Sequence, residues 1–132
     1  MKVILDASAI MAVILNESNR DTVITLTENA VILSPEVISF EIGNALINLF
    51  RKRKITEEEL LAAYRNYTTI PIESIKIDIE KALKIACKYK IYAYDAYYLE
   101  AAHRLKLPLI TFDNSMKKAG LDLKIKMTEV ET

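Results

Sequence analysis

The chain has 132 residues with 18 Lys and Arg against 18 Asp and Glu, so its formal net charge is zero. Such a chain has no overall field that would draw it to nucleic acid or to a membrane, and any polyanion binding must depend on a local patch. A hydrophobic fraction of 52% and a charged fraction of 27% exclude a disordered chain. We expect one domain over residues 1–132.

The first segment, VILDASAIMAVIL, is apolar or small at every position except Asp6. It is shorter than the roughly 20 apolar residues that a membrane span needs, and no small-residue cleavage site of a signal peptide follows it. We therefore expect a cytoplasmic protein with no membrane segment. The pattern predicts a buried strand at Lys2–Leu5, then a helix from Ser8 or Ala9 to Leu15 that is buried on all sides.

The rest of the chain alternates between helical and strand patterns. Ser34, Pro35 and Glu36 are typical of a helix start with Ser34 as N-cap, and this helix should reach about Lys52. Thr56 begins a capping box. The other predicted elements are helices at 20–28, 56–67, 78–90, 93–105 and 113–119, the last closed by Gly120, and strands at 30–33, 70–72 (an edge strand), 109–111 and 123–127. Short apolar strands between helices predict an α/β fold with a parallel sheet covered on both faces.

The single Cys and the single His do not form a zinc site, because such a site needs more ligands of these types. Cys87 falls in the apolar phase of its helix, and we expect a buried structural thiol. His103 lies near a helix C-terminus, where a surface residue that stabilises the helix dipole is the expected role.

Four acids interrupt apolar patterns. Asp6 directly follows the strand VIL, and Asp113 follows LITF, so both side chains should lie at the carboxyl edge of the sheet, where ligands bind in α/β folds. Glu41 is the one charge within VISFEIGNALINLF, and Asp95 is the one charge within IYAYDAYYL. For Asp6, Asp95 and Asp113 a helix N-cap is the alternative role, and for Glu41 it is an exposed helix face.

A cluster of these four carboxylates could not stay fully ionised without a counter-ion. Oxygen ligands of this kind suit Mg²⁺ or Mn²⁺, which complete their coordination with water and substrate phosphate. A nucleophile elbow of the G-x-S-x-G type is absent from the sequence, and so is a glycine-rich phosphate loop, since Gly43 and Gly120 are the only glycines.

The segments LDASAI, FEIGNAL, YDAYYLEAA and LITFDNSM, in this order and over nearly the whole length, resemble the PIN-domain ribonucleases, in particular the VapC-type toxins of type II toxin–antitoxin systems. The resemblance implies a three-layer α/β/α fold around a central, mostly parallel sheet of four to five strands. It also implies a Mg²⁺-dependent endoribonuclease, with Mn²⁺ as a substitute, whose catalytic metal ligands are Asp6, Glu41, Asp95 and Asp113.

Further roles follow from the same resemblance. Ser8 matches a small hydroxyl residue that orders the first carboxylate, and Asn44 matches a polar neighbour of the site. The partners that it implies are an RNA substrate, a cognate antitoxin that blocks the site, and a second copy of the chain in a homodimer. The apolar helices at 37–50 and 58–67 offer a groove for an antitoxin segment, although burial in the core is the ordinary role of such positions.

Other interpretations of the same residues stay open. The chain could be a catalytically silent PIN-like interaction module, or a Mg²⁺-binding phosphatase or phosphoacceptor domain, although Ser8 stands where one such phosphatase type has its second Asp. The basic run 51–54 is typical of a helix C-terminus, and Lys117 and Lys118 lie closer to the acids in sequence. The tyrosines 92, 94, 97 and 98 could stack on RNA bases, but a place in the core or in a subunit contact is more usual.

Overall fold

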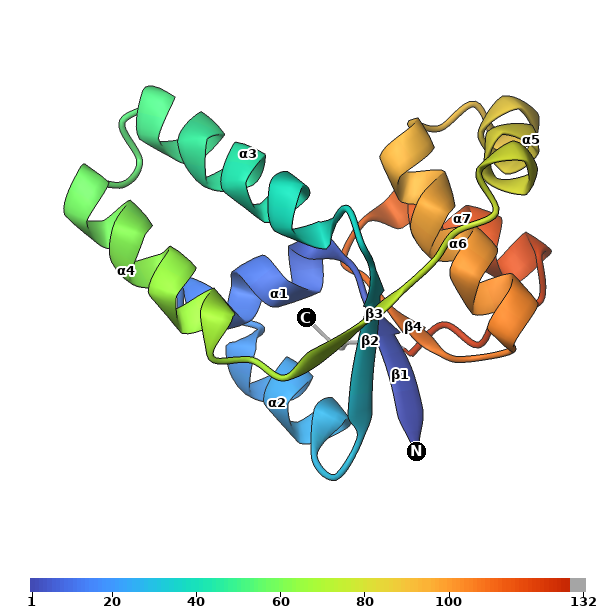
Figure 1. Cartoon of the computed structure of the whole chain (residues 1–132), viewed down its shortest axis with the longest axis horizontal. Coiled ribbons are helices and arrows are strands. Elements are labelled where there is room, and N and C mark those ends of the chain that lie inside the picture. The colour runs from blue at the N-terminus through green and yellow to red at the C-terminus, as the bar shows by residue number, and fades with distance from the viewer. Residues whose placement is uncertain (129–132) are drawn as a thin grey trace.

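Four strands and seven helices make up residues 1–128, the part of the chain that this computed structural model describes (Figure 1). The strands β1 (Lys2–Leu5), β2 (Val31–Pro35), β3 (Ile72–Ile75) and β4 (Leu109–Ile110) form one parallel sheet in the order β3-β2-β1-β4. The helices are α1 (Ala7–Ile14), α2 (Arg20–Thr27), α3 (Ile38–Arg51), α4 (Glu57–Thr68), α5 (Ile79–Tyr89), α6 (Ala93–Leu105) and α7 (Asn114–Asp122). The predicted α/β class is confirmed.

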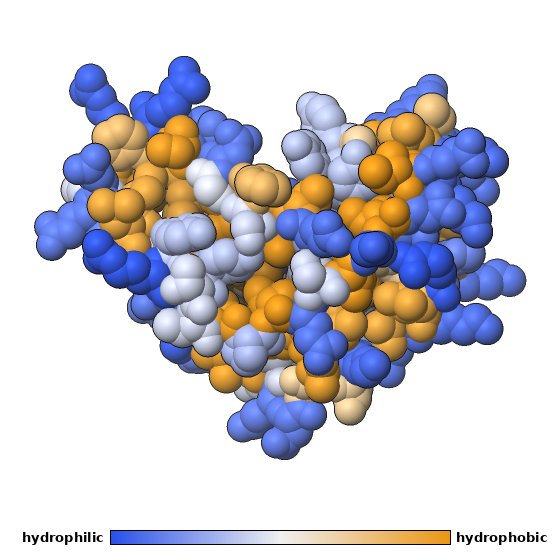
Figure 2. All heavy atoms as spheres, viewed as in Figure 1, coloured by the Kyte–Doolittle hydropathy of each residue, from blue (hydrophilic) through white to orange (hydrophobic). Residues whose placement is uncertain are grey.

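The helices cover both faces of the sheet, which gives the expected three layers. Figure 1 shows α1 to α4 on one side of the strands and α5 to α7 on the other. Of these, α1 contacts β1, while α6 packs across β1, β2 and β4. The α3–α4 pair and the α5–α7 group diverge as two arms from the sheet, and the surface between them is hollowed (Figure 2). We call this hollow the notch.

The hydrophobic core explains why the first strand is central. Val3, Ile4 and Leu5 of β1 are buried, and so is nearly all of α1, including Ile10 and Ile14. Each such side chain contributes roughly 1.5–3 kcal/mol through removal of its apolar surface from water. A strand that is buried on both faces fits only the interior of a sheet covered by helices. The residues that follow β1 therefore leave the sheet at an inner position of its carboxyl edge.

The predicted helix start at Ser34 is wrong. Ser34 and Pro35 extend β2, where they pair in register with Ser74 and Ile75 of the neighbouring strand, and α3 begins only at Ile38. The Ser34 hydroxyl is fully buried and donates a 2.7 Å hydrogen bond to the carbonyl of Leu5 on β1. The sheet thus uses the hydroxyl that the local pattern assigned to a helix cap.

The predicted last strand at 123–127 is reduced to one bridge between Met127 and Leu109 of β4. The helix before it also runs further than predicted, because α7 continues through Gly120 to Asp122. A Cβ atom at Gly120 would lie 2.4 Å from the sulfur of Met127. The glycine therefore does not end the helix, but lets the following segment pass closely against it.

The remaining boundaries differ from the predicted ones by small amounts, except at the third strand. That strand is an edge strand as expected, but it occupies Ile72–Ile75 and begins after Pro71.

Cys87 is exposed, so the predicted buried thiol is wrong. Helix α5 packs against α6 with its opposite face, around the buried Ala82. None of the helices in residues 1–128 is long and apolar enough to cross a membrane.

Candidate active site

Asp6 and Asp113 both lie where the chain leaves the carboxyl edge of the sheet. Asp6 is the N-cap of α1, and its Oδ1 accepts hydrogen bonds from the Ala9 amide at 3.0 Å and from the Ser8 hydroxyl at 2.7 Å. Asp113 is the N-cap of α7, and its Oδ1 accepts from the Met116 amide at 2.9 Å. The N-cap alternative is therefore correct for both residues, and each cap uses Oδ1 of its carboxylate.

A buried threonine that the sequence analysis did not identify joins these two acids. The Thr111 hydroxyl, at the end of β4, donates to Oδ2 of Asp6 and accepts from the Asp113 amide at 3.0 Å. Its side chain is 1% exposed. The available signal was a polar residue directly after the buried Leu109–Ile110 pair, a position where a buried hydroxyl must find partners.

Ser8 makes the predicted contact with Asp6 and also fixes the loop that carries Asp113. Its hydroxyl oxygen accepts a 3.0 Å hydrogen bond from the Phe112 amide while its proton goes to Asp6. Ser8 and Thr111 thus hold the Asp6 carboxylate from two elements that are more than 100 residues apart in the chain. The position of Asp6 is fixed on both of its oxygens.

Glu41 reaches the same region from the first turn of α3. Its Oε1 accepts a 2.8 Å hydrogen bond from the Tyr98 hydroxyl on α6. Burial, together with the negative charge of Glu41, raises the pKa of Tyr98, so this phenol stays protonated and acts as the donor. Tyr98 is buried, so it does not stack on RNA; it connects the two helices that carry Glu41 and Asp95.

Asp95 lies in the first turn of α6, three residues beyond the N-cap position, which is occupied by Tyr92. The N-cap role is therefore excluded for Asp95. The carboxyl is half-buried, and its burial together with the charges of Asp113 and Asp6 raises its pKa to about 6. No hydrogen bond within residues 1–128 offsets this shift.

The charges of the four acids act on neighbouring members of the group. Burial raises the pKa of Asp6 despite its three hydrogen bonds, and the charge of Asp113 adds to the shift. Burial likewise raises the pKa of Glu41, and the charges of Asp6 and Asp95 add to it. Mutual repulsion of this kind requires that the carboxylates lie close together. The structure therefore brings Asp6, Glu41, Asp95 and Asp113 to one edge of the sheet.

The carboxylate oxygens that accept no hydrogen bond suit a divalent metal ion. Both oxygens of Asp95, Oε2 of Glu41 and Oδ2 of Asp113 accept no hydrogen bond from the described residues, and Oδ2 of Asp6 has one donor for its two lone pairs. Carboxylate oxygen is the ligand that Mg²⁺ and Mn²⁺ prefer. In residues 1–128, however, no three His, Cys, Asp or Glu side chains already stand in an arrangement that could hold a metal.

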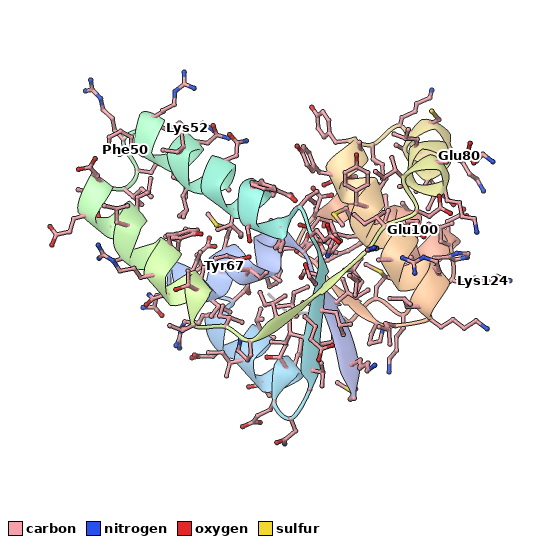
Figure 3. The ribbon with its side chains drawn as sticks, viewed as in Figure 1. Phe50, Lys52, Tyr67, Glu80, Glu100 and Lys124 are labelled. Atoms are coloured by element: carbon pink, nitrogen blue, oxygen red, sulfur yellow. The ribbon has the colours of Figure 1, made fainter. Side chains whose placement is uncertain are left out.

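Other predicted candidates lie further away. Asn44 is exposed on α3, one turn beyond Glu41. The basic run 51–54 is exposed at the outer end of α3, where Figure 3 labels Lys52, and ten residues of helix place it about 15 Å from Glu41 along the axis. Its expected role at the helix C-terminus agrees with this position. Tyr92 and Tyr94 are exposed, by contrast with Tyr98.

The sequence also matches the model of a known protein family. Residues 3–121 match the family model described as PIN domain. No curated protein sequence matches the chain.

Solved structures give the same fold. The structure of PAE2754 from Pyrobaculum aerophilum has a TM-score of 0.69 at 25% sequence identity, over 90% of this chain and 87% of that one. VapC20 of Mycobacterium tuberculosis, described as a toxin that cleaves the sarcin–ricin loop, has a TM-score of 0.65 at 12% identity, over 89% and 95% of the two chains. VapBC2 from Rickettsia felis, bound to a DNA fragment from its promoter, has a TM-score of 0.64 at 13% identity, over 97% and 98%.

Proposed function

Because this chain belongs to the PIN-domain family, we propose that it is a metal-dependent endoribonuclease and the toxin of a toxin–antitoxin pair. Its proposed reaction is the hydrolysis of RNA phosphodiester bonds with Mg²⁺, for which Mn²⁺ can substitute. The proposed catalytic metal ligands are Asp6, Glu41, Asp95 and Asp113, with Ser8 and Asn44 in supporting positions.

One observation carries this proposal. Burial and mutual repulsion raise the pKa of three of the four acids, and no Lys or Arg charge contributes to the shift of any of them. A group of carboxylates that a fold buries without a cation of its own is a candidate for binding one from solution. Groups of titratable side chains with perturbed pKa values are a general mark of functional sites.

The chain supplies positions and charges for this reaction. A divalent ion held by the four carboxylates would lower the pKa of a bound water and neutralise charge on the scissile phosphate. Ser8 and Thr111 restrict the Asp6 carboxylate to one orientation, and the Tyr98 hydroxyl does the same for Glu41. Asp95 has no such restraint and is free to turn toward an ion.

The proposed partners are an antitoxin and a second copy of the chain. Support for both comes from apolar side chains that the α3–α4 arm leaves exposed, whose burial in the core was the ordinary expectation: Phe40, Ile47, Phe50, Leu61 and Tyr64. Phe40 is 78% exposed. Structural relatives of this chain include a toxin–antitoxin complex from Klebsiella pneumoniae, with a TM-score of 0.55 at 17% identity, over 84% of this chain and 86% of that one.

A catalytically silent PIN-like module is the second candidate. The observation in its favour is that Asp6 and Asp113 have a complete structural role as N-caps of α1 and α7. The caps do not account for Glu41 or for Asp95, which cap no helix.

Cleavage of defined RNAs by the purified chain, free of antitoxin, tests the proposal. We expect cleavage with Mg²⁺ or Mn²⁺, none with a chelator, and none for Asp6→Asn. Asp21→Asn is the matched control, since Asp21 is an exposed acid on α2 whose one ion pair, with Arg20, is also exposed. Cleavage that continues in the chelator, or that survives in Asp6→Asn, would refute the metal site. A chain that folds, binds the ions and cleaves no RNA would favour the silent module.

A further inference from the structure

A pocket of about 430 Å³ lies between α1, the segment 15–19 and α3. We call it the side pocket. Most of its wall is apolar, and its polar groups come from Ser8, Glu17, Ser18, Asn19 and Asn48. A concave, largely apolar site with a few polar groups is the usual form of a small-ligand site.

The side pocket lies next to the candidate active site, with which it shares Ser8. Ser8 lines the pocket and donates to the Asp6 carboxylate, while Phe112 lines it next to Asp113 in the sequence. On α3 the pocket residues Ala45 and Asn48 follow Glu41 by four and seven residues, so all three lie on one face of that helix. A nucleotide whose phosphate lies at the acids could therefore place its base in the pocket.

The chemistry of the pocket wall fits a nucleobase and not a phosphate. None of the described residues that line it is Lys or Arg, and Glu17 gives it a negative charge. Amide side chains such as Asn19 and Asn48 both donate and accept hydrogen bonds, as base edges do, and the aromatic ring of Phe112 offers a stacking surface. The Asn19 side chain is not used to cap α2.

We propose that the side pocket binds one unpaired nucleobase of the RNA substrate, beside the phosphodiester that is cleaved; this rests on the proposed function. The Glu17 carboxylate accepts a hydrogen bond from an exocyclic amino group, which adenine, cytosine and guanine have and uracil lacks. The pocket therefore disfavours uracil. It also requires a single-stranded or looped substrate, because a paired base cannot leave its helix to enter.

The test compares the binding of labelled five-nucleotide RNAs, A5, C5 and U5, by fluorescence anisotropy with Mg²⁺ present. The protein carries Asp95→Asn so that it does not cleave them. We expect A5 and C5 to bind about tenfold more tightly than U5, the discrimination typical of one good base contact. Glu17→Leu should reduce this preference to less than about twofold, because the carboxylate that accepts from the amino group is lost. The control Glu58→Leu changes an exposed acid on α4 outside the pocket and should keep the preference.

Equal binding of the three RNAs, or a preference that Glu17→Leu leaves intact, would overturn the proposal. So would a change of molecular mass in Glu17→Leu by light scattering without a change in base preference, since the pocket would then be a contact between copies. A parallel cleavage assay of the unmodified chain separates the two proposals. Base preference without cleavage refutes the ribonuclease and keeps the pocket, while cleavage without base preference refutes the pocket alone.

Discussion

Asp6 and Glu100 are both buried carboxylates, 3% and 2% exposed, with different surroundings. Glu100, labelled on α6 in Figure 3, accepts hydrogen bonds from Arg104 at 2.7 and 3.3 Å and from the Asp78 amide at 3.3 Å. Arg104 also donates to the Lys76 carbonyl, so the pair ties the segment before α5 to α6. Asp6 has neutral donors only, from Ser8, Ala9 and Thr111.

The difference separates a structural carboxylate from a candidate ligand. A buried charge is tolerated when the fold supplies an opposite charge with good hydrogen-bond geometry, as Arg104 does for Glu100. Asp6, Glu41 and Asp95 instead have other carboxylates as their charged neighbours, and burial together with these charges raises their pKa values. The same chain thus pairs one buried acid with a cation of its own and leaves a group of others without such a partner.

The largest expected difference between the two regions is in RNA cleavage. Asp95→Asn should reduce the rate at least about a hundredfold, as does the loss of one group that stabilises transition-state charge. Glu100→Gln makes the same chemical change on the same helix, and we expect it to leave the rate unchanged. Single-turnover cleavage of one RNA by both variants measures this. An equal loss of cleavage rate in Asp95→Asn and Glu100→Gln would mean that the four acids have no special role.

Stability should respond in the opposite way. Glu100→Gln should lower the free energy of unfolding by about 1–3 kcal/mol, because charged hydrogen bonds to Arg104 and to the Asp78 amide are weakened. The loss is limited by the 38% exposure of the Arg104 side chain. Asp95→Asn should cost nothing, because it relieves repulsion. Urea unfolding without metal at pH 7.5 measures both, and a lower stability of Asp95→Asn would contradict the comparison.

The neutral donors around Asp6 can be tested separately. Thr111→Val keeps the shape of the side chain and removes its hydrogen bond to Asp6. We expect Mg²⁺ or Mn²⁺ affinity, measured by calorimetry, to fall about tenfold, since groups that orient metal ligands commonly have such effects. Thr68→Val removes an exposed hydroxyl on α4 and is the control. Unchanged affinity in Thr111→Val would show that Asp6 needs no orientation from this side.

The smallest effect is the pH dependence of the metal-free chain. Asp95 has a folded-state pKa of about 6 against 3.8 as its ordinary value, so the folded state holds the proton more tightly than the unfolded one. Stability should therefore be highest near pH 4 and fall as the pH rises through 6, by about 1 kcal/mol after allowance for solvent screening of this half-buried group. Thermal unfolding across this range should show the fall, and Asp95→Asn or added Mg²⁺ should reduce it. A stability that rises from pH 4 to 7 would contradict the assigned shift.

The fold class, and the choice of the four acids as candidate site residues, could be predicted because their signals are local. An apolar strand that ends in Asp6, or an apolar helix interrupted by Glu41, can be recognised from neighbouring residues alone. Ser34 shows the limit of such reasoning, because a serine before a proline suits a helix cap and a strand end equally, and its contact with Leu5 comes from a different strand.

Residues that hold the acids could not be predicted in the same way. Thr111 is 105 residues from Asp6, and Tyr98 is 57 residues from Glu41, so only the packed sheet and helices bring them together. Glu100 and Arg104 are one turn apart on α6, but the sequence does not show that the Asp78 amide, at the start of α5, lies against Glu100. Long-range contacts of this kind decide which polar residue is buried, and a single sequence carries no direct record of them.

The bridge between Met127 and Leu109 bears on the behaviour of the chain at high concentration. Sheet edges with free backbone groups invite pairing with other molecules and are a route to aggregation. Leu109 of β4 donates to the Lys126 carbonyl and accepts from the Thr128 amide, so the returning segment shields this edge. Met127 lies against Gly120 in that segment. Oxidation of its sulfur would make this packed apolar side chain polar, and we expect it to loosen the segment that shields the edge.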